Sequence, residues 1–96
     1  MTNKQRAFLS SLATNEDSIL RIGKGSITPE YIGAIEEAIA KRELIKISVL
    51  KNCMDDPHAI AEVIAERTKS EVVRVIGRKI ILYRPAKKPV IKLPEK

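Results

Sequence analysis

The chain has 96 residues and a net charge of +6, with 44% hydrophobic and 31% charged residues, as expected for one small globular domain. Its single cysteine, Cys53, excludes a disulfide framework and a cysteine-based zinc site, and its apolar runs are too short to span a membrane. Because residues 2–6 are polar and no apolar signal-peptide core follows them, a cytoplasmic location is expected.

The first half of the chain predicts a helix, a short strand and a second helix. Thr2 and Gln5 form a capping-box pattern at the start of the first helix. The apolar face of that helix consists of Phe8, Leu9, Leu12 and Ala13. A short apolar strand over 18–22 follows, and then a helix over 28–42 with Thr28 as its N-cap. The buried stripe of this second helix consists of Tyr31, Ile32, Ile35, Ala38 and Ile39.

The middle of the chain predicts a strand and a third helix. Residues 43–51 alternate in polarity, as in a strand with one core face and one mixed face. The core face carries Ile45, Ile47 and Val49, and the mixed face carries Leu44, Lys46, Ser48 and Leu50. Asp56 as N-cap and Pro57 at the first helical position begin a helix that runs to about residue 69. Its buried residues are expected to be Ile60, Val63 and Ile64.

The last part of the chain predicts a β-hairpin and an arm. Strands over 71–76 and 79–84 flank a tight turn at 77–78. Residues 85–96 contain three prolines and are expected to form an extended, partly disordered basic arm beyond a domain of residues 1–84. The element order is therefore α-β-α-β-α-β-β. It predicts a single α/β domain in which helices pack on a four-stranded mixed sheet.

The positive charge is concentrated at one end of the chain. Residues 1–77 contain 11 basic and 11 acidic residues, whereas residues 78–96 contain seven basic residues and one acidic residue. The seven are Arg78, Lys79, Arg84, Lys87, Lys88, Lys92 and Lys96. A polyanionic partner explains this asymmetry economically, and a loose basic tail that only solvates the chain is the alternative.

Residues capable of catalysis or metal binding are few. His58, the only histidine, follows Pro57 in the first turn of a helix, where a solvated surface residue is expected. Asp55 and Asp56 fit a helix-capping loop better than a metal site. No Ser or Cys has a histidine partner fixed by the sequence. We therefore expect no enzymatic activity, metal, cofactor or small-molecule substrate.

Residues 23–26, Gly-Lys-Gly-Ser, stand directly before the second helix. Gly23 and Gly25 permit positive φ and a close approach of a ligand to the backbone. The N–H groups of the first helical turn attract an anion, and Lys24 adds a cation. The pattern predicts a phosphate contact, with a plain strand-to-helix connection as the alternative.

A basic surface is expected around this loop if the hairpin lies near it. The other members of that surface would be Lys46, Arg78, Lys79 and Arg84. Such a surface would bind a polyanion with a marked salt dependence, whereas scattered solvated charges would not. The chain has only three aromatic residues, which argues against RNA recognition by rows of stacked rings.

Four separated blocks of sequence form a specific pattern. They are Lys4-Gln5-Arg6-Ala7-Phe8-Leu9, Ile22-Gly23-Lys24-Gly25 with Ile27-Thr28, Ala38-Ile39 with Arg42-Glu43-Leu44-Ile45-Lys46, and Val75-Ile76-Gly77-Arg78 with Ile81-Leu82-Tyr83-Arg84-Pro85. In this order, and over nearly the whole length, the chain resembles the CRM domain (chloroplast RNA splicing and ribosome maturation), specifically its stand-alone YhbY-like RNA-binding form.

This resemblance implies an α/β fold similar to the C-terminal domain of translation initiation factor three. It also implies RNA binding, which in stand-alone members is tied to precursors of the large ribosomal subunit. The Gly-x-x-Gly loop of the family, similar to that of KH domains, corresponds to residues 23–26, where Ser26 replaces the last glycine. A serine can still donate hydrogen bonds there, but it fits poorly if the backbone needs positive φ.

The sequence therefore predicts a non-enzymatic RNA-binding domain that acts in ribosome assembly. Lys24 and the backbone of Gly23, Gly25 and Ser26 would hold phosphates. The residues that widen this footprint would be Lys4, Arg6, Arg78, Lys79 and Arg84. One alternative is a protein-interaction module that docks on a ribosomal protein through an apolar patch such as Leu44 and Leu50. A DNA-binding domain is a second alternative.

Overall fold

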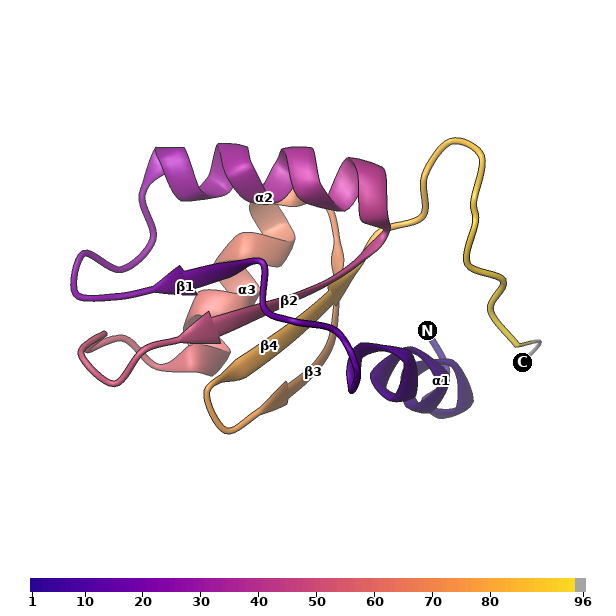
Figure 1. The fold of residues 1–96 in the computed structure, drawn as a ribbon, viewed down its shortest axis with the longest axis horizontal. Helices are drawn as coiled ribbons and strands as arrows, with labels where there is room; N and C mark the ends of the chain where they lie inside the picture. The colour runs from indigo at the N-terminus through magenta and orange to yellow at the C-terminus, as the bar shows by residue number, and fades with distance from the viewer. Residues whose placement is uncertain (95–96) are drawn as a thin grey trace.

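A computed structural model describes residues 1–94, and its element order is the predicted one (Figure 1). The elements are α1 (Asn3–Ala13), β1 (Leu20–Ile22), α2 (Pro29–Arg42), β2 (Leu44–Val49), α3 (Pro57–Thr68), β3 (Glu71–Ile76) and β4 (Lys79–Tyr83). Glu95 and Lys96, two of the charged residues in the predicted arm, lie outside the described residues. No helix within residues 1–94 has the length and apolar character needed to cross a membrane.

The three helices begin where the sequence predicts because each has a polar cap. In the capping box of α1, the Gln5 N–H donates to Thr2 Oγ1 at 3.1 Å and the Thr2 N–H donates to Gln5 Oε1 at 3.0 Å. Thr28 and Asp56 cap α2 and α3, and each is followed by a proline at the helix start. A cap of this kind stabilises a helix by about 1 kcal/mol.

The four strands form one mixed sheet in the order β1-β2-β4-β3. β1 pairs parallel with β2, whereas β4 pairs antiparallel with both β2 and β3. β1 and β2 are shorter than the strands predicted over 18–22 and 43–51. Just before β2, Glu43 has a φ of 66°, which an extended strand does not allow. Just after β2, Leu50 begins a turn in which its carbonyl accepts from the Cys53 N–H at 3.0 Å.

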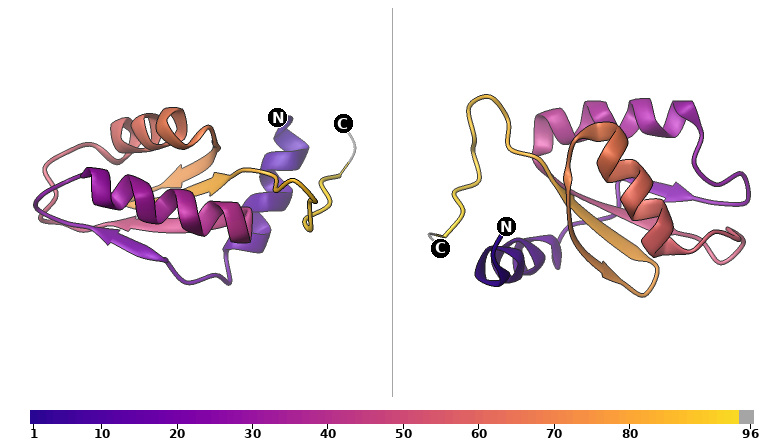
Figure 2. Two further views of the ribbon diagram at one scale, coloured as in Figure 1. Left: turned by 90° about the horizontal axis from the view of Figure 1, so that it is seen from above. Right: turned by 180° about the vertical axis from the view of Figure 1, so that it is seen from behind.

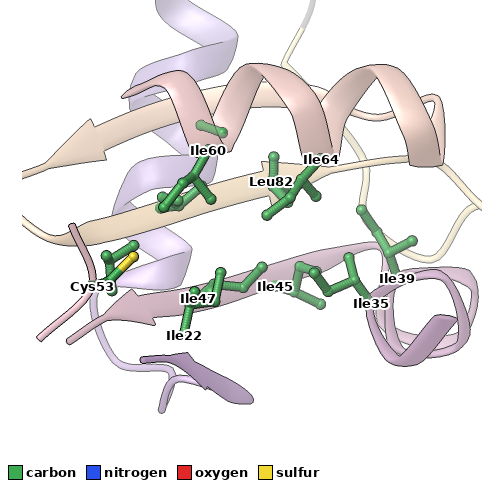
Figure 3. Packing of buried hydrophobic residues seen from close by; sticks show 12 residues of the cluster. Ile22, Ile35, Ile39, Ile45, Ile47, Cys53, Ile60, Ile64 and Leu82 are labelled. Carbon is green, nitrogen blue, oxygen red and sulfur yellow. The ribbon is translucent and has the colours of Figure 1, made fainter. Parts of the chain in front are cut away.

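The main core lies between one face of the sheet and helices α2 and α3 (Figures 2 and 3). Its strand residues include Ile45, Ile47 and Val49, as the alternation predicts. Its helix residues include Ile35, Ile39, Ile60 and Ile64. Cys53 is also buried in this core. The prediction that Val63 is buried is wrong, since Val63 is 43% exposed. Successive residues of a helix are rotated by about 100° about its axis, so Val63 points away from the core that the next residue, Ile64, enters.

The opposite face of the sheet is only partly covered. Helix α1 packs Leu9 and Ala13 against a second cluster of sheet residues. That cluster consists of Leu44, Val73, Ile81 and Tyr83. Phe8 and Leu12, predicted to share the buried face of α1, are 37% and 41% exposed because α1 covers one end of the sheet (Figure 1). Within residues 1–94, no helix covers the hairpin end of this face.

Glu43 holds the C-terminal arm, residues 85–94, against the domain. Its side chain is buried, with a residue exposure of 1%. The carboxylate accepts hydrogen bonds from the N–H groups of Ala86 at 2.9 Å, Val90 at 2.8 Å and Ile91 at 3.0 Å. Three amide donors replace the water that a buried carboxylate loses, so burial of this charge is compensated.

Further contacts attach the end of the arm to α1. Ile91 and Leu93 pack against the second cluster, and Gln5 Nε2 donates to Pro94 O at 3.1 Å. The described part of the arm is therefore docked on the domain, although the sequence predicts an extended segment that is partly disordered.

Glu43 and Glu36 should make the fold sensitive to acid. The hydrogen bond from the Ala86 N–H, opposed by burial and aided by the two other amides, lowers the pKa of Glu43 below its ordinary value of 4.5. The hydrogen bond from Arg84 lowers the pKa of Glu36. As the pH falls, the unfolded carboxyls bind protons first, so the stability present above about pH 5 is lost on acidification.

The urea concentration at the midpoint of unfolding is therefore expected to decrease when the pH is lowered from about 7 to about 3.5. The fall should be smaller in Glu43→Gln, because the amide does not titrate. An equal pH dependence in the two proteins would contradict the role assigned to Glu43.

Candidate nucleic-acid interface

Three connections meet at the end of the sheet that lies opposite α1 (Figure 1, left). They are the β1–α2 loop (residues 23–28), the β2–α3 loop (residues 50–56) and the β3–β4 turn (residues 77–78), which together we call the loop end. Leu50 joins them, since its N–H donates to Ile22 O at 2.8 Å and its carbonyl accepts from Arg78 Nη1 at 3.1 Å. The hairpin therefore lies near the glycine loop, as the predicted basic surface requires.

The glycine loop closes as a tight turn in which the Ser26 N–H donates to Gly23 O at 2.9 Å. The expectation that the glycines supply positive φ is wrong: neither Gly23 nor Gly25 has a positive φ, and the left-handed residue is Ser26, at 56°. The Ser26 hydroxyl donates to the Asp55 carboxylate of the neighbouring loop, a contact that supports this unfavourable conformation. Ser26, which replaces the last glycine of the Gly-x-x-Gly pattern, is thus the residue of this turn that has a positive φ.

Gly25 lies open beside Lys24 at the tip of the loop. A Cβ atom at Gly25 would meet nothing within 4 Å, and φ is not positive, so the fold itself does not require glycine there. A Cβ atom at Gly23 would instead lie 3.4 Å from Asn52 Oδ1. The backbone of the tip is therefore accessible to a ligand, whereas the base of the loop is packed.

The N-terminus of α2 is a modest anion site. Thr28 Oγ1 already accepts from the Tyr31 N–H at 3.3 Å, and Pro29 has no N–H to offer. Glu30 adds a carboxylate in the first turn, where it neutralises part of the helix dipole. Attraction of an anion therefore depends on the cations around the loop more than on the helix.

Four exposed cations lie at the loop end, three in these connections and one at the start of β4. They are Lys24, Lys51, Arg78 and Lys79. Arg78 is oriented by its hydrogen bond to Leu50 O, and Lys79 Nζ donates to Ser48 Oγ at 2.6 Å. Each of these two side chains has further N–H donors beyond the one so used, and these can reach a phosphate.

Two more cations, Arg21 and Arg74, extend the positive charge over the open face of the sheet. Arg21 lies opposite Ser48, which in turn lies opposite Lys79, so the three side chains share one face. Arg74 pairs with Ile81 of the second cluster and therefore shares that face. Arg21 and Lys79 are two strands apart, about 10 Å. In the sequence, each arginine is a single cation between apolar neighbours in a strand, a pattern too common to single it out as a binding residue.

A groove of about 390 Å³ separates the glycine loop from α3. Ile27, Ala59 and Val63 form part of its apolar lining, and Asp55 and Asp56 contribute carboxylates. The groove is therefore unsuited to a phosphate, but it fits a flat apolar group that carries hydrogen-bond donors.

Three of the residues predicted to bind RNA lie away from the loop end. Arg6 donates to the carbonyl of Val73 at 3.1 Å and so fastens α1 to β3. Arg84 donates to Thr68 O at 2.7 Å at the far end of the sheet. Lys4 is exposed on the first turn of α1. The structure thus places Lys24, Arg78 and Lys79 at the loop end, but not Lys4, Arg6 or Arg84.

Two other expectations about this surface are wrong. Lys46 does not join the loop end, because its Nζ donates to Ala13 O at 3.3 Å and to Glu16 O at 3.4 Å, below the end of α1. Leu44 and Leu50 do not form an apolar docking patch: Leu44 belongs to the buried second cluster, whereas Leu50 lies at the loop end.

The acidic residues near the loop end serve local structure. Asp56 caps α3 by accepting from the His58 N–H at 3.3 Å, as the sequence predicts. Asp55 holds Ser26. Within residues 1–94, no group of three His, Cys, Asp or Glu side chains is arranged to hold a metal ion.

The architecture defines an α/β domain with two helices on one face of a mixed sheet, one helix on the other, and a glycine loop before α2. The family model of the CRS1 / YhbY (CRM) domain matches residues 1–84. The chain therefore belongs to the CRS1 / YhbY (CRM) family.

Several relatives are similar over nearly their full length. The Bacillus subtilis protein named "Probable RNA-binding protein YqeI" is 41% identical over 87 residues, which are 91% of either chain. A Haemophilus influenzae protein named "RNA-binding protein" is 32% identical over 96 residues, covering 100% of this chain and 97% of that protein. The solution structure of SAV1595 from Staphylococcus aureus, described as a candidate RNA-binding protein, superimposes with a TM-score of 0.83 at 46% identity, covering 98% and 99% of the two chains.

Proposed function

We propose that this chain is a non-enzymatic RNA-binding protein whose target is ribosomal RNA in cytoplasmic precursors of the large ribosomal subunit. The proposal rests on one observation: four exposed cations lie at the loop end, which carries an open glycine tip. They are Lys24, Lys51, Arg78 and Lys79. The names of the Bacillus subtilis and Haemophilus influenzae relatives support RNA as the class of ligand.

In the proposed complex, the RNA backbone crosses the loop end. Because the Ser26 N–H is already donated to Gly23, the backbone donors offered to a phosphate are those of Lys24 and Gly25. Arg78 and Lys79 hold the next phosphates, and Arg21 continues the track over the open face of the sheet. The loop-end surface that we propose does not include the distant residues Lys4, Arg6 and Arg84.

The groove beside the loop would receive an unstacked base from this backbone. Its apolar lining, which includes Ile27 and Val63, suits the face of a base, and Asp55 and Asp56 can accept from an exocyclic amino group. Phosphates are kept out of the groove by the same carboxylates. This arrangement favours single-stranded loops or bulges over a regular duplex.

The test is a titration of purified large-subunit ribosomal RNA at several salt concentrations. With about four phosphates neutralised, log K should fall with log salt at a slope of about −3. Duplex DNA of equal charge should compete poorly, and small-subunit ribosomal RNA should bind more weakly.

Each alternative gives a different result. A salt-independent interaction with ribosomal proteins that survives nuclease would favour the protein-interaction module. Equal competition by duplex DNA would favour a DNA-binding domain. Equal affinity for the two ribosomal RNAs would remove the large subunit from the proposal but leave RNA binding in place.

A further inference from the structure

A second groove, of about 790 Å³, lies between the end of α2 and the C-terminal arm. Both segments are at the opposite end of the molecule from the loop end (Figure 1, right). One wall is the last turn of α2, with Ala40 and Lys41, and the other wall is the arm over residues 84–90. The longest dimension of the molecule is 39 Å, so this groove and the loop end are well separated. We call it the arm groove.

The arm groove carries positive charge that nearby acids do not neutralise. Its exposed cations are Lys41, Lys87 and Lys88. None of these lysines takes part in the two ion pairs found within residues 1–94. Of the acids close by, Glu36 is paired with Arg84, and the Glu43 carboxylate is occupied by the three arm amides. Glu37, four residues before Lys41 on α2, forms no ion pair within residues 1–94.

The two arm lysines are held in position. Lys87 and Lys88 lie between Ala86 and Val90, whose N–H groups both donate to the Glu43 carboxylate. A segment tied at both ends has few conformations left to lose when a ligand binds. The lysines are therefore a preorganised part of the surface rather than a loose electrostatic tail.

We infer that the arm groove is a second site for RNA phosphates, so that one RNA molecule contacts the domain at both ends. The cations suit the backbone, and the apolar lining, which includes Ala40, Pro85 and the 82%-exposed Val90, suits a sugar or base. The inference rests on the proposed function. It also extends beyond it, because the family match ends at residue 84 and the arm lies outside it.

The first experiment removes one cation from each wall, in Lys41→Gln/Lys88→Gln. The matched control, Lys4→Gln/Lys69→Gln, removes the same charge from α1 and from the end of α3. With large-subunit ribosomal RNA as the probe, the wall variant should lower the magnitude of the salt slope by about 1.4, because two phosphates, each contributing about 0.7 on a single strand, are no longer neutralised. The control should keep the wild-type slope.

The second experiment uses Glu43→Gln, which keeps every cation and raises the net charge by one. Its amide nitrogen cannot accept hydrogen bonds, so the variant loosens the arm. A docked arm predicts weaker RNA binding, by several-fold, at a temperature where the variant is folded. A loose basic tail predicts binding that is unchanged or tighter, because the charge has increased.

The outcomes separate this inference from the proposed function. A wild-type slope in the wall variant would overturn the inference, as would unchanged or tighter binding by Glu43→Gln. If Lys24→Glu abolishes RNA binding while the wall variant binds as wild type does, the proposed function stands and the second site falls. If wild type binds no RNA, both fall.

Discussion

Lys24→Glu is expected to weaken binding to large-subunit ribosomal RNA by about tenfold or more at about 0.1 M salt. Lys24 is exposed at the tip of the glycine loop, and none of the hydrogen bonds or ion pairs found within residues 1–94 involves its side chain. The substitution therefore removes no interaction that holds the fold, and the melting temperature should stay within about 2 °C of wild type, as for other surface changes. Filter binding and thermal unfolding measure the two quantities.

Two further variants sharpen this test. Lys4→Glu reverses the same charge on α1, outside the proposed RNA surface, and should change RNA affinity by less than about twofold. Gly25→Ala adds a methyl group to a position with open space and no positive φ, so it should fold normally and bind RNA more weakly if a phosphate approaches the backbone. Wild-type affinity in Lys24→Glu would remove the glycine loop from the interface.

Glu43→Ala should have the largest effect on stability, a loss of about 3 kcal/mol, which corresponds to about 15 °C in melting temperature for a domain of this size. The substitution removes the acceptor of three amide hydrogen bonds in a buried site. It also leaves a residue other than glycine at a φ of 66°, where only glycine is free of strain. Because small domains have only about 5–15 kcal/mol of stability, the loss is a large fraction.

Comparison of three substitutions separates the contribution of the carboxylate to stability from that of the backbone conformation at residue 43. Glu43→Gln keeps the shape of the side chain and should cost less than Glu43→Ala. Glu43→Gly relieves the strain of positive φ and should be about 1 kcal/mol more stable than Glu43→Ala. Urea unfolding measures all three, and values for the Ala and Gly variants within about 0.5 kcal/mol of wild type would show that the carboxylate does not hold the arm.

The fold was predictable because local signals in this chain agree with one another. Thr2, Thr28 and Asp56 mark helix starts through hydrogen bonds to residues two or three positions away, so the sequence itself carries the information. Alternation in residues 44–49 assigned the two faces of β2 correctly, because strand side chains change sides at every residue. The four-block resemblance pointed to the family that the comparison shows.

The candidate site was less predictable because its geometry depends on long-range contacts. Nothing local shows that Arg84 is fastened to the end of α3, or that Glu43 binds amides more than 40 residues away. Ser26, which has the positive φ, contacts Asp55, which lies 29 residues further along the chain. The distribution of charge along the sequence therefore identified the basic C-terminal segment. It could not show which of those cations lie at the loop end and which lie in the arm groove.

The edge strand β1 has a consequence for the dynamics of the complex. It is only three residues long, pairs with β2 alone, and leads directly into the glycine loop. Short edge strands detach first in the local openings of a native protein. A ligand that needs the loop in place would oppose that opening by mass action. RNA bound at the tip would therefore slow the fraying of this edge, and the amide protons of β1 would exchange with solvent more slowly in the complex than in the isolated domain.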